Sequence, residues 1–306
     1  MALPNLLLRL NCKEYKNWMK AGLCLQILQS RLQGYIDSEM QKFHRQIIAG
    51  ISPTARHRPR CQCRSQGKQF QPSCPVCMEW KNNILHHHKN RNGEIHWGNC
   101  NPSLWPIDYW ELAKVFLPRG HTKSKGPHEC DAAALLNLIN FCDQFQVSNV
   151  SKVREVIKCR NDLMHSSNMK VSSSWLNDFG QKMQDLISEL RHVPNSVNDP
   201  IQEVLLSDWS VDDLSVNEVD GFNAESFGGE FVYLRNSPLD GVSLNELEIQ
   251  LVNQLLEELY LQKEESRALS EEDLGTVCKM KTFLIENQDL LPVFQEDLEK
   301  LELLLN

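Results

Sequence analysis

Apolar side chains recur every three or four positions through most of this 306-residue chain, and that spacing constrains the fold more than any other feature. Residues at i, i+3 and i+4 share one face of an α-helix, so the spacing predicts amphipathic helices. The pattern runs through residues 13–49, 131–191, 244–262, 271–286 and 290–305. Gly34 interrupts the first of these ranges, which predicts two helices there. With no internal repeat and no strand-rich range, the sequence predicts an all-α protein.

The segments between these helices suggest how the chain is divided. Residues 10–195 are expected to form one helical domain, with a Cys- and His-rich insertion at 55–105. Residues 196–242 mix Asp, Asn, Ser, Gly and Pro without a period, which predicts a disordered linker. Residues 243–306 are predicted to form a unit of acidic amphipathic helices.

Charge is distributed unevenly along the chain. Residues 1–125 carry 19 Lys and Arg against 7 Asp and Glu, a net charge of +12, whereas residues 199–306 carry 6 against 25, a net charge of −19. A basic front and an acidic back predict two units with different partners. The alternative is that the acidic tail folds onto the basic face and masks it.

The sequence also indicates the cellular compartment in which the protein is expected. No stretch approaches eighteen consecutive apolar residues, which argues against a membrane span. The N-terminal apolar run lacks a basic flank and contains Arg9, so we do not expect a signal peptide. Eleven cysteines without a secretory signal indicate thiols or metal ligands in a reducing compartment. We therefore expect an intracellular protein, in the cytoplasm or the nucleus.

Five of the cysteines lie between residues 61 and 100. Cys74 and Cys77 form a C-x2-C knuckle, in which two thiolates hold one tetrahedral ion. We predict a structural zinc site made of Cys63, Cys74, Cys77 and Cys100. The other candidate ligands are Cys61, His96 and the three histidines at 86–88. A set of free surface thiols is the alternative interpretation.

Tryptophans lie close to this cysteine cluster. Trp97, Trp105 and Trp110 are interleaved with Lys89 and Arg91, an arrangement that can stack on bases. Such tryptophans more often pack a small metal-binding subdomain, and we favour that interpretation.

The stretch KCRNDLMH, residues 158–165, carries the candidate chemistry. On a helix, Asn161 and His165 share a face and Arg160 lies at its edge. An imidazole transfers protons near neutral pH, and a guanidinium binds phosphate. Together they could cleave RNA without metal, because the base would activate the 2′-hydroxyl for attack on the adjacent phosphate. By spacing alone, a helix cap, a buried hydrogen bond or a solvated edge explains the residues better.

The R-x4-H arrangement with Asn after the Arg resembles the motif of HEPN domains (higher eukaryote and prokaryote nucleotide-binding), which are small all-α modules. The motif late in one helix, then a polar loop and a Trp/Phe-bearing helix, is similar to the HEPN type of a DAZ-interacting zinc-finger ubiquitin ligase. The chain also resembles an uncharacterised vertebrate family named after open reading frame 38 of chromosome X. That resemblance rests on the stretches CKEYKNWMKAG, HWGNC, FLPRG and CRNDLMHSS.

The resemblance implies a fold and a function. It implies an HEPN-like helical bundle that binds RNA, as a homodimer if the Arg and His of one site come from two protomers. Arg160 and His165 would then be the catalytic pair of a metal-independent endoribonuclease, with Asn161 as an orienting group. Many HEPN domains keep the motif without cleaving RNA, so whether the chain is an enzyme stays open. The alternative is a non-catalytic scaffold whose acidic C-terminal helices bind protein partners.

Overall fold

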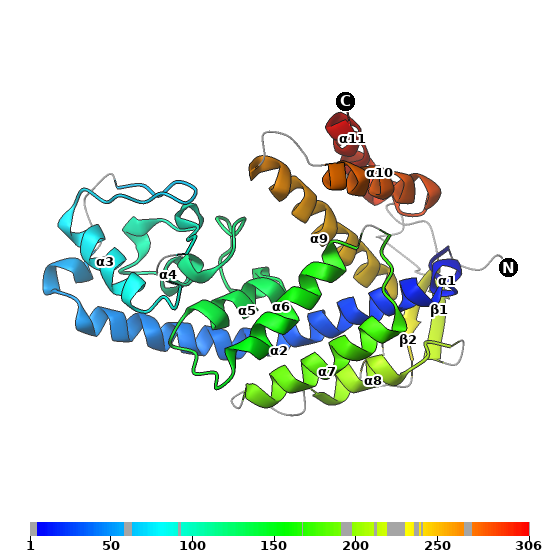
Figure 1. Ribbon diagram of the computed structural model, residues 1–306, viewed down its shortest axis with the longest axis horizontal. Helices are drawn as coiled ribbons and strands as arrows, with labels where there is room; N and C mark the ends of the chain where they lie inside the picture. Colours follow the sequence, from blue (N-terminus) through cyan, green and yellow to red (C-terminus); the bar gives the residue numbers. More distant parts are fainter. Residues whose placement is uncertain are drawn as a thin grey trace. The chain divides into compact units, whose positions relative to one another are not determined.

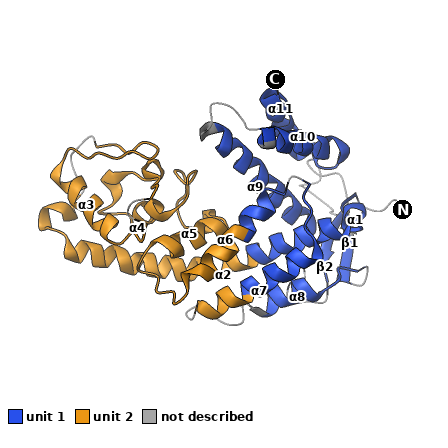
Figure 2. Cartoon of the chain, viewed as in Figure 1, with its two compact units in different colours: residues 1–25, 159–183, 198–306 blue, residues 26–158, 184–197 orange. Residues whose placement is uncertain are grey.

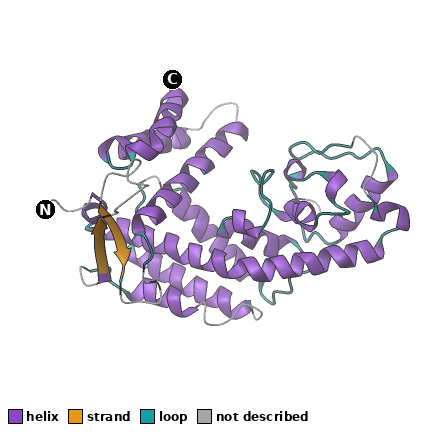
Figure 3. Ribbon diagram, turned by 180° about the vertical axis from the view of Figure 1, so that it is seen from behind, coloured by secondary structure: helices purple, strands orange, loops and turns teal. Residues whose placement is uncertain are grey.

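The computed structural model is mainly helical, as the apolar spacing predicts (Figures 1 and 3). It describes residues 5–57, 63–90, 93–166, 168–190, 198–210, 213–218, 230–235, 239, 241–265 and 271–305. Within these ranges, no helix is both long and apolar enough to cross a membrane. A two-stranded hairpin accompanies the helices, and the sequence pattern did not predict it.

The chain divides into two compact units, coloured separately in Figure 2. Unit 1 consists of residues 1–25, 159–183 and 198–306, and unit 2 of residues 26–158 and 184–197. The division does not coincide with the predicted domain 10–195. Three helices contribute residues to both units: α2 (Lys13–Gly50), α6 (Val150–Met164) and α7 (Ser173–Glu189).

Unit 1 contains the C-terminal helices and the hairpin. The elements that lie wholly in unit 1 are α1 (Asn5–Leu10), α8 (Asn198–Leu206), β1 (Leu214–Glu218), β2 (Glu230–Leu234), α9 (Leu244–Glu265), α10 (Glu271–Glu286) and α11 (Leu291–Leu305). Arg9 of α1 binds Glu248 of α9 through two nitrogens, each 2.6 Å from a carboxylate oxygen. The same guanidinium binds Asn287 and Asp289, which lie between α10 and α11. One cation, whose side chain is only 9% exposed, therefore joins three segments that are distant in sequence.

Unit 2 is built around aromatic rings. Its helices are α3 (Pro75–His86), α4 (Tyr109–Ala113) and α5 (Ala132–Phe141), together with parts of α2, α6 and α7. The side chains of Trp80, Trp97, Trp105 and Trp110 are all buried. This burial supports packing, and not base stacking, as the role of the tryptophans near the cysteine cluster. Asp108 caps α4 by accepting the backbone N–H of Trp110 at 2.8 Å.

Gly34 does not divide the first helical range. The structure has one helix, α2, through this position, so the prediction of two helices is wrong. Leu32, Ile36 and Met40 are all fully buried and keep four-residue spacing across the glycine. A glycine inside a helix costs about 1 kcal/mol relative to alanine. Burial of this apolar stripe outweighs that cost.

The range 196–242 also differs from the predicted disordered linker. It contains α8 and the antiparallel strands β1 and β2, whose register runs from Leu214 opposite Leu234 to Glu218 opposite Glu230. Ile201, Trp209 and Val232 are buried. These few apolar residues are buried within unit 1. No local periodicity in the sequence predicts their burial. Residues 219–229 lie outside the described ranges.

Candidate functional site

Helix α6 carries the KCRNDLMH motif in its last turns. The helix forms because Val153, Val156, Cys159 and Leu163 recur at helical spacing, and all four are buried. Its last residue is Met164, and the backbone N–H of His165 donates to the carbonyl of Asn161 at 2.8 Å. The motif thus lies where the sequence placed it, at the end of a helix.

Arg160 is buried in unit 1 and bound to an acidic residue. Its side chain is 9% exposed, and Nη1 lies 2.7 Å from Oε1 of Glu258 on α9. Glu258 is itself 27% exposed. Burial of a charged guanidinium costs free energy, because the group loses its hydration. The carboxylate of Glu258 compensates for this cost, so the two side chains should stay paired. In this arrangement the cation that would bind phosphate already binds a carboxylate.

His165 is exposed and lies near α9, the helix that carries Glu258. Its Nδ1 is 3.5 Å from Nε2 of Gln262, which is one helical turn beyond Glu258 on α9. Residues four apart share a helix face, so a single face of α9 reaches both motif residues. We call this pair of interactions, Arg160 with Glu258 and His165 with Gln262, the α9 contact. Asn161 is half-buried beside it.

The α9 contact defines what the motif can do chemically. His165 is accessible to solvent, whereas Arg160 would have to leave Glu258 before it could bind another anion. Sequence analysis missed Glu258 and Gln262, because nothing local marks one glutamate among the many of the acidic tail. The excess of negative charge in the tail was the only hint.

Three cysteines of the predicted zinc site come together in unit 2. The Sγ atoms of Cys63, Cys74 and Cys77 lie within 4.8 Å of one another. Sulfurs on one tetrahedral zinc lie about 3.8 Å apart, given a Zn–S bond of about 2.3 Å, so a small adjustment would suffice. Cys74 is the N-cap of α3, and its sulfur accepts the backbone N–H of Cys77 at 3.3 Å. That bond gives the donor set the supporting contact that thiolate ligands need.

Cys100, predicted as the fourth ligand, lies outside this group. It is buried, and its Sγ donates to the carbonyl of Trp97 at 3.3 Å. Burial raises the pKa of its thiol to about 12, which disfavours the thiolate that a metal would need. Cys61, another candidate, lies outside the described residues.

The histidines after α3 have structural roles. His88 is buried between the rings of Phe116 and Phe141, with ring centroids 5.1 Å and 5.5 Å away. Its Nδ1 accepts the backbone N–H of Asn90 at 3.1 Å. Nδ1 of His87 lies 2.9 Å from a carboxylate oxygen of Asp143. These contacts hold the residues that follow α3 against the C-terminal end of α5.

Comparison with known proteins adds sequence relatives but no structural ones. The chain matches the family described as a domain of unknown function (DUF4559) over residues 9–305. It is 48% identical over 307 residues to a mouse (Mus musculus) protein named "Uncharacterized protein CXorf38 homolog", with 99% of this chain and 93% of the mouse protein covered. No solved structure matches the chain. The resemblance to the chromosome X open reading frame family is therefore confirmed, whereas the HEPN resemblance stays a prediction.

Proposed function

The chain belongs to this family of domains of unknown function, and on that premise we propose that it binds RNA through an HEPN-like module closed by its own helix α9. The interaction between Arg160 and Glu258 carries the proposal. A guanidinium that binds a carboxylate through a charge-assisted hydrogen bond can bind a phosphate in the same way. Glu258 therefore takes the place that a phosphate of RNA would occupy.

The distribution of charge supports RNA as the competing anion. Helix α6, which bears Arg160, carries four Lys and Arg against two Asp and Glu, a net charge of +2. Basic surfaces attract nucleic-acid backbones and release their counterions, which gives binding that weakens as salt rises. The acidic C-terminal helices would oppose such binding.

Neutralisation of the competing carboxylate tests the proposal. Glu258→Gln should tighten the binding of a fluorescent single-stranded oligoribonucleotide, measured by anisotropy at low salt. The matched control is Glu246→Gln, which removes the same charge from an exposed position on the same helix. The proposal fails if both variants bind RNA equally well, because the gain would then reflect net charge alone.

Ribonuclease activity would require the α9 contact to open. The HEPN resemblance implies that two motifs meet across a dimer, with Arg160 from one protomer and His165 from the other. In the Glu258→Gln background, cleavage should then proceed with chelator present and leave a cyclic phosphate. Arg160→Ala and His165→Ala should each abolish cleavage, and a mixture of the two variants should restore it. A mixture that stays inactive while both variants are folded and dimeric would rule out the shared site.

We infer that the three clustered cysteines hold a structural zinc ion. The support is the close approach of Cys63, Cys74 and Cys77, together with the N–H···S bond at the start of α3. Thiolate ligands in this knuckle favour zinc. Bound there, the ion would join the loop at Cys63 to α3 and stabilise this part of unit 2.

Metal analysis of purified, reduced protein tests the zinc site. We expect about one zinc per chain, as for a structural site of this kind, and loss of the metal in Cys74→Ser and Cys77→Ser. The matched control is Cys278→Ser, which replaces an exposed cysteine on α10. Absence of zinc from the wild type, or its loss from the Cys278 variant, would contradict the inference.

A non-catalytic scaffold is the second candidate, and exposed apolar side chains favour it. Ile285 on α10 is 48% exposed and Leu303 on α11 is 73% exposed, both on the acidic helices. Such side chains can bind a protein partner. Proximity labelling in cells should then lose specific partners in Ile285→Glu and Leu303→Glu, with RNA binding unchanged. An identical set of labelled partners would count against this role.

A further inference from the structure

The cysteine cluster of unit 2 has a second chemistry besides metal binding. Cys63, Cys74 and Cys77 are thiols in the structure, and their Sγ atoms lie within 4.8 Å of one another. Two sulfurs this close can also be joined covalently when an oxidant removes two electrons and two protons. Backbone position and burial decide which two sulfurs join and which of them an oxidant reaches first.

Cys74 and Cys77 lie together at the start of α3. Cys74 is the N-cap, and Cys77 follows three residues later in the first turn. The backbone N–H of Cys77 donates to Sγ of Cys74 at 3.3 Å, which holds that sulfur close to the residue it would join. Residues three apart on a helix have Cβ atoms about 5–6 Å apart, so an adjustment of about 1–2 Å reaches the spacing of a disulfide. Cys63, by contrast, lies on a separate loop, where its Sγ is 3.6 Å from the hydroxyl of Ser73.

The two sulfurs at the start of α3 differ in their access to solvent. Cys74 is half-buried, whereas Cys77 is buried and only 1% exposed. A small oxidant that arrives from solvent therefore reaches Cys74 first, because oxidation of a cysteine depends on exposure. Such a pair suits a two-step reaction in which the accessible sulfur is oxidised and the buried sulfur then bonds to it.

The loop that carries Cys63 is held in place by contacts outside the cluster. The hydroxyl of Ser65 donates to the carbonyl of Cys100 at 2.6 Å. The side chain of Phe70 is buried, and its ring centroid lies 5.4 Å from that of Trp97. None of these contacts uses a sulfur of the cluster, so a covalent bond at the start of α3 should leave the fold of this loop intact.

We propose that Cys74 and Cys77 form a reversible disulfide when the protein meets hydrogen peroxide. The sulfur of Cys74 attacks one peroxide oxygen and the O–O bond breaks. The thiol proton goes to the departing hydroxide, so that water leaves and Cys74 becomes a sulfenic acid. The sulfur of Cys77 then attacks the sulfur of Cys74, and the hydroxyl leaves as water with the proton of Cys77. Two thiols have then lost two electrons and two protons, and one peroxide has become two waters.

The disulfide and the zinc ion inferred above exclude each other. A sulfur in a disulfide no longer offers the anionic ligand that zinc needs, so oxidation removes two of the three clustered donors. Zinc release therefore rests on the proposed zinc site. Formation of the disulfide needs only the two sulfurs, and it should also occur in metal-free protein.

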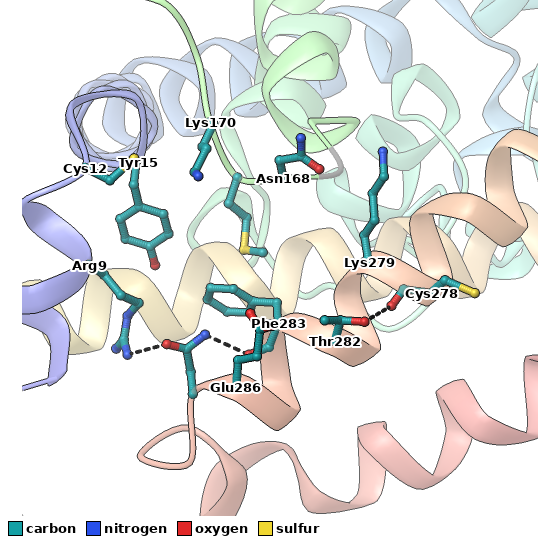
Figure 4. A pocket seen from close by; sticks show the side chains of 12 residues that line it. Arg9, Cys12, Tyr15, Asn168, Lys170, Cys278, Lys279, Thr282, Phe283 and Glu286 are labelled. Atoms are coloured by element: carbon teal, nitrogen blue, oxygen red, sulfur yellow. Dashed lines mark hydrogen bonds between the residues drawn. The ribbon is translucent and has the colours of Figure 1, made fainter.

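Titration of the purified, reduced protein with hydrogen peroxide, followed by alkylation and peptide mass spectrometry, tests the proposal. Cys278 is an internal reference, because it is exposed on α10. In Figure 4 its sulfur lies apart from that of Cys12, the other cysteine that lines the same pocket of unit 1. At peroxide doses that oxidise Cys278, the wild type should contain a Cys74–Cys77 cross-link that lacks two hydrogen atoms. Dithiothreitol should restore both thiols.

Variants of the cluster check which sulfurs take part. Cys63→Ser is the matched control, because it removes the third sulfur of the cluster and should leave the cross-link unchanged. Cys74→Ser should leave the buried Cys77 reduced. In the double variant Cys63→Ser/Cys77→Ser, dimedone, which traps sulfenic acids, should label Cys74.

The proposal is overturned if Cys74 and Cys77 remain thiols when Cys278 is oxidised, or if the cross-link joins Cys63 to Cys74 instead. A chromogenic chelator that records zinc release separates this proposal from the zinc site. Release of zinc without a cross-link would overturn the disulfide and leave the zinc site standing. A Cys74–Cys77 cross-link in protein that held no zinc would support the disulfide and remove the zinc site alone.

Discussion

Unit 1 and unit 2 join distant parts of the chain by different interactions. In unit 1, Arg9 binds Glu248 across 239 residues and Asp289 across 280. In unit 2, the buried Lys114 pairs with Glu111 only three residues away. Its long-range contacts include ring packing, such as that of Phe43 on Phe116 at 6.0 Å. Among the described residues, the buried ion pairs that join distant segments are in unit 1. The long-range ion pairs of unit 2, such as that of His87 with Asp143, are more exposed, and most ring contacts between distant residues are in this unit.

This difference has an energetic consequence. A buried ion pair stabilises little beyond what its desolvation costs, but loss of one partner leaves an uncompensated charge. Burial lowers the pKa of Arg9, but the hydrogen bonds and charges of Asp289 and Glu248 outweigh it and raise the pKa overall. Unit 1 should therefore be sensitive to changes in single charges, and unit 2 to changes in shape and to protonation of its buried histidines, His44 and His88.

The largest expected effect is in unit 1. Arg9→Met should destabilise the protein by about 3–5 kcal/mol, because the buried Glu248 loses its counter-charge. The measurement is urea unfolding, combined with hydrogen exchange that locates the loss in unit 1. Arg31→Met, at an exposed position of α2 in unit 2, is the control. A loss below about 1 kcal/mol, typical of surface pairs, would contradict the account.

A smaller effect should appear in unit 2 as pH falls. Burial lowers the pKa of His88 to about 4, from 6.5 in the unfolded chain. The unfolded state therefore binds the proton more readily, and stability falls as pH drops from 6.5 through 4 by at most about 3 kcal/mol.

Replacement of this histidine isolates its contribution. His88→Phe keeps a ring between Phe116 and Phe141 but removes the titrating group. Urea midpoints at several pH values should show a flatter acid limb in this variant than in the wild type. Superimposable pH profiles would show that His88 does not titrate with folding.

The smallest effects are expected at two glycines of α2, one in each unit, so that the units are compared on a single helix. A Cβ on Gly34, in unit 2, would meet nothing within 4 Å, so Gly34→Ala should stabilise by up to about 1 kcal/mol. A Cβ on Gly22, in unit 1, would lie 2.3 Å from a methyl carbon of the buried Leu251 on α9. Gly22→Ala should therefore destabilise by about 1–3 kcal/mol. Thermal unfolding measures both, and shifts of the same sign would contradict this contrast.

Local patterns in the sequence predicted much of this molecule, and long-range contacts account for what they missed. The helical class follows from apolar spacing, and the approach of Cys74 to Cys77 from a four-residue motif. The partner of Arg160 lies 98 residues away on α9, where no periodicity distinguishes Glu258 from its neighbours. Ring contacts of His88 with Phe116 and Phe141 likewise depend on tertiary packing, so the three histidines looked like candidate ligands.

The central claim is that Glu258 competes with RNA for Arg160, and a double-mutant cycle on RNA affinity tests it most directly. Oligoribonucleotide affinity would be measured for the wild type, Glu258→Gln, Arg160→Gln and the double variant. Glu258→Gln should tighten binding in the wild-type background and have no effect when Arg160 is replaced. If Glu258→Gln gives the same gain with and without Arg160, the two residues are not coupled and the account is contradicted.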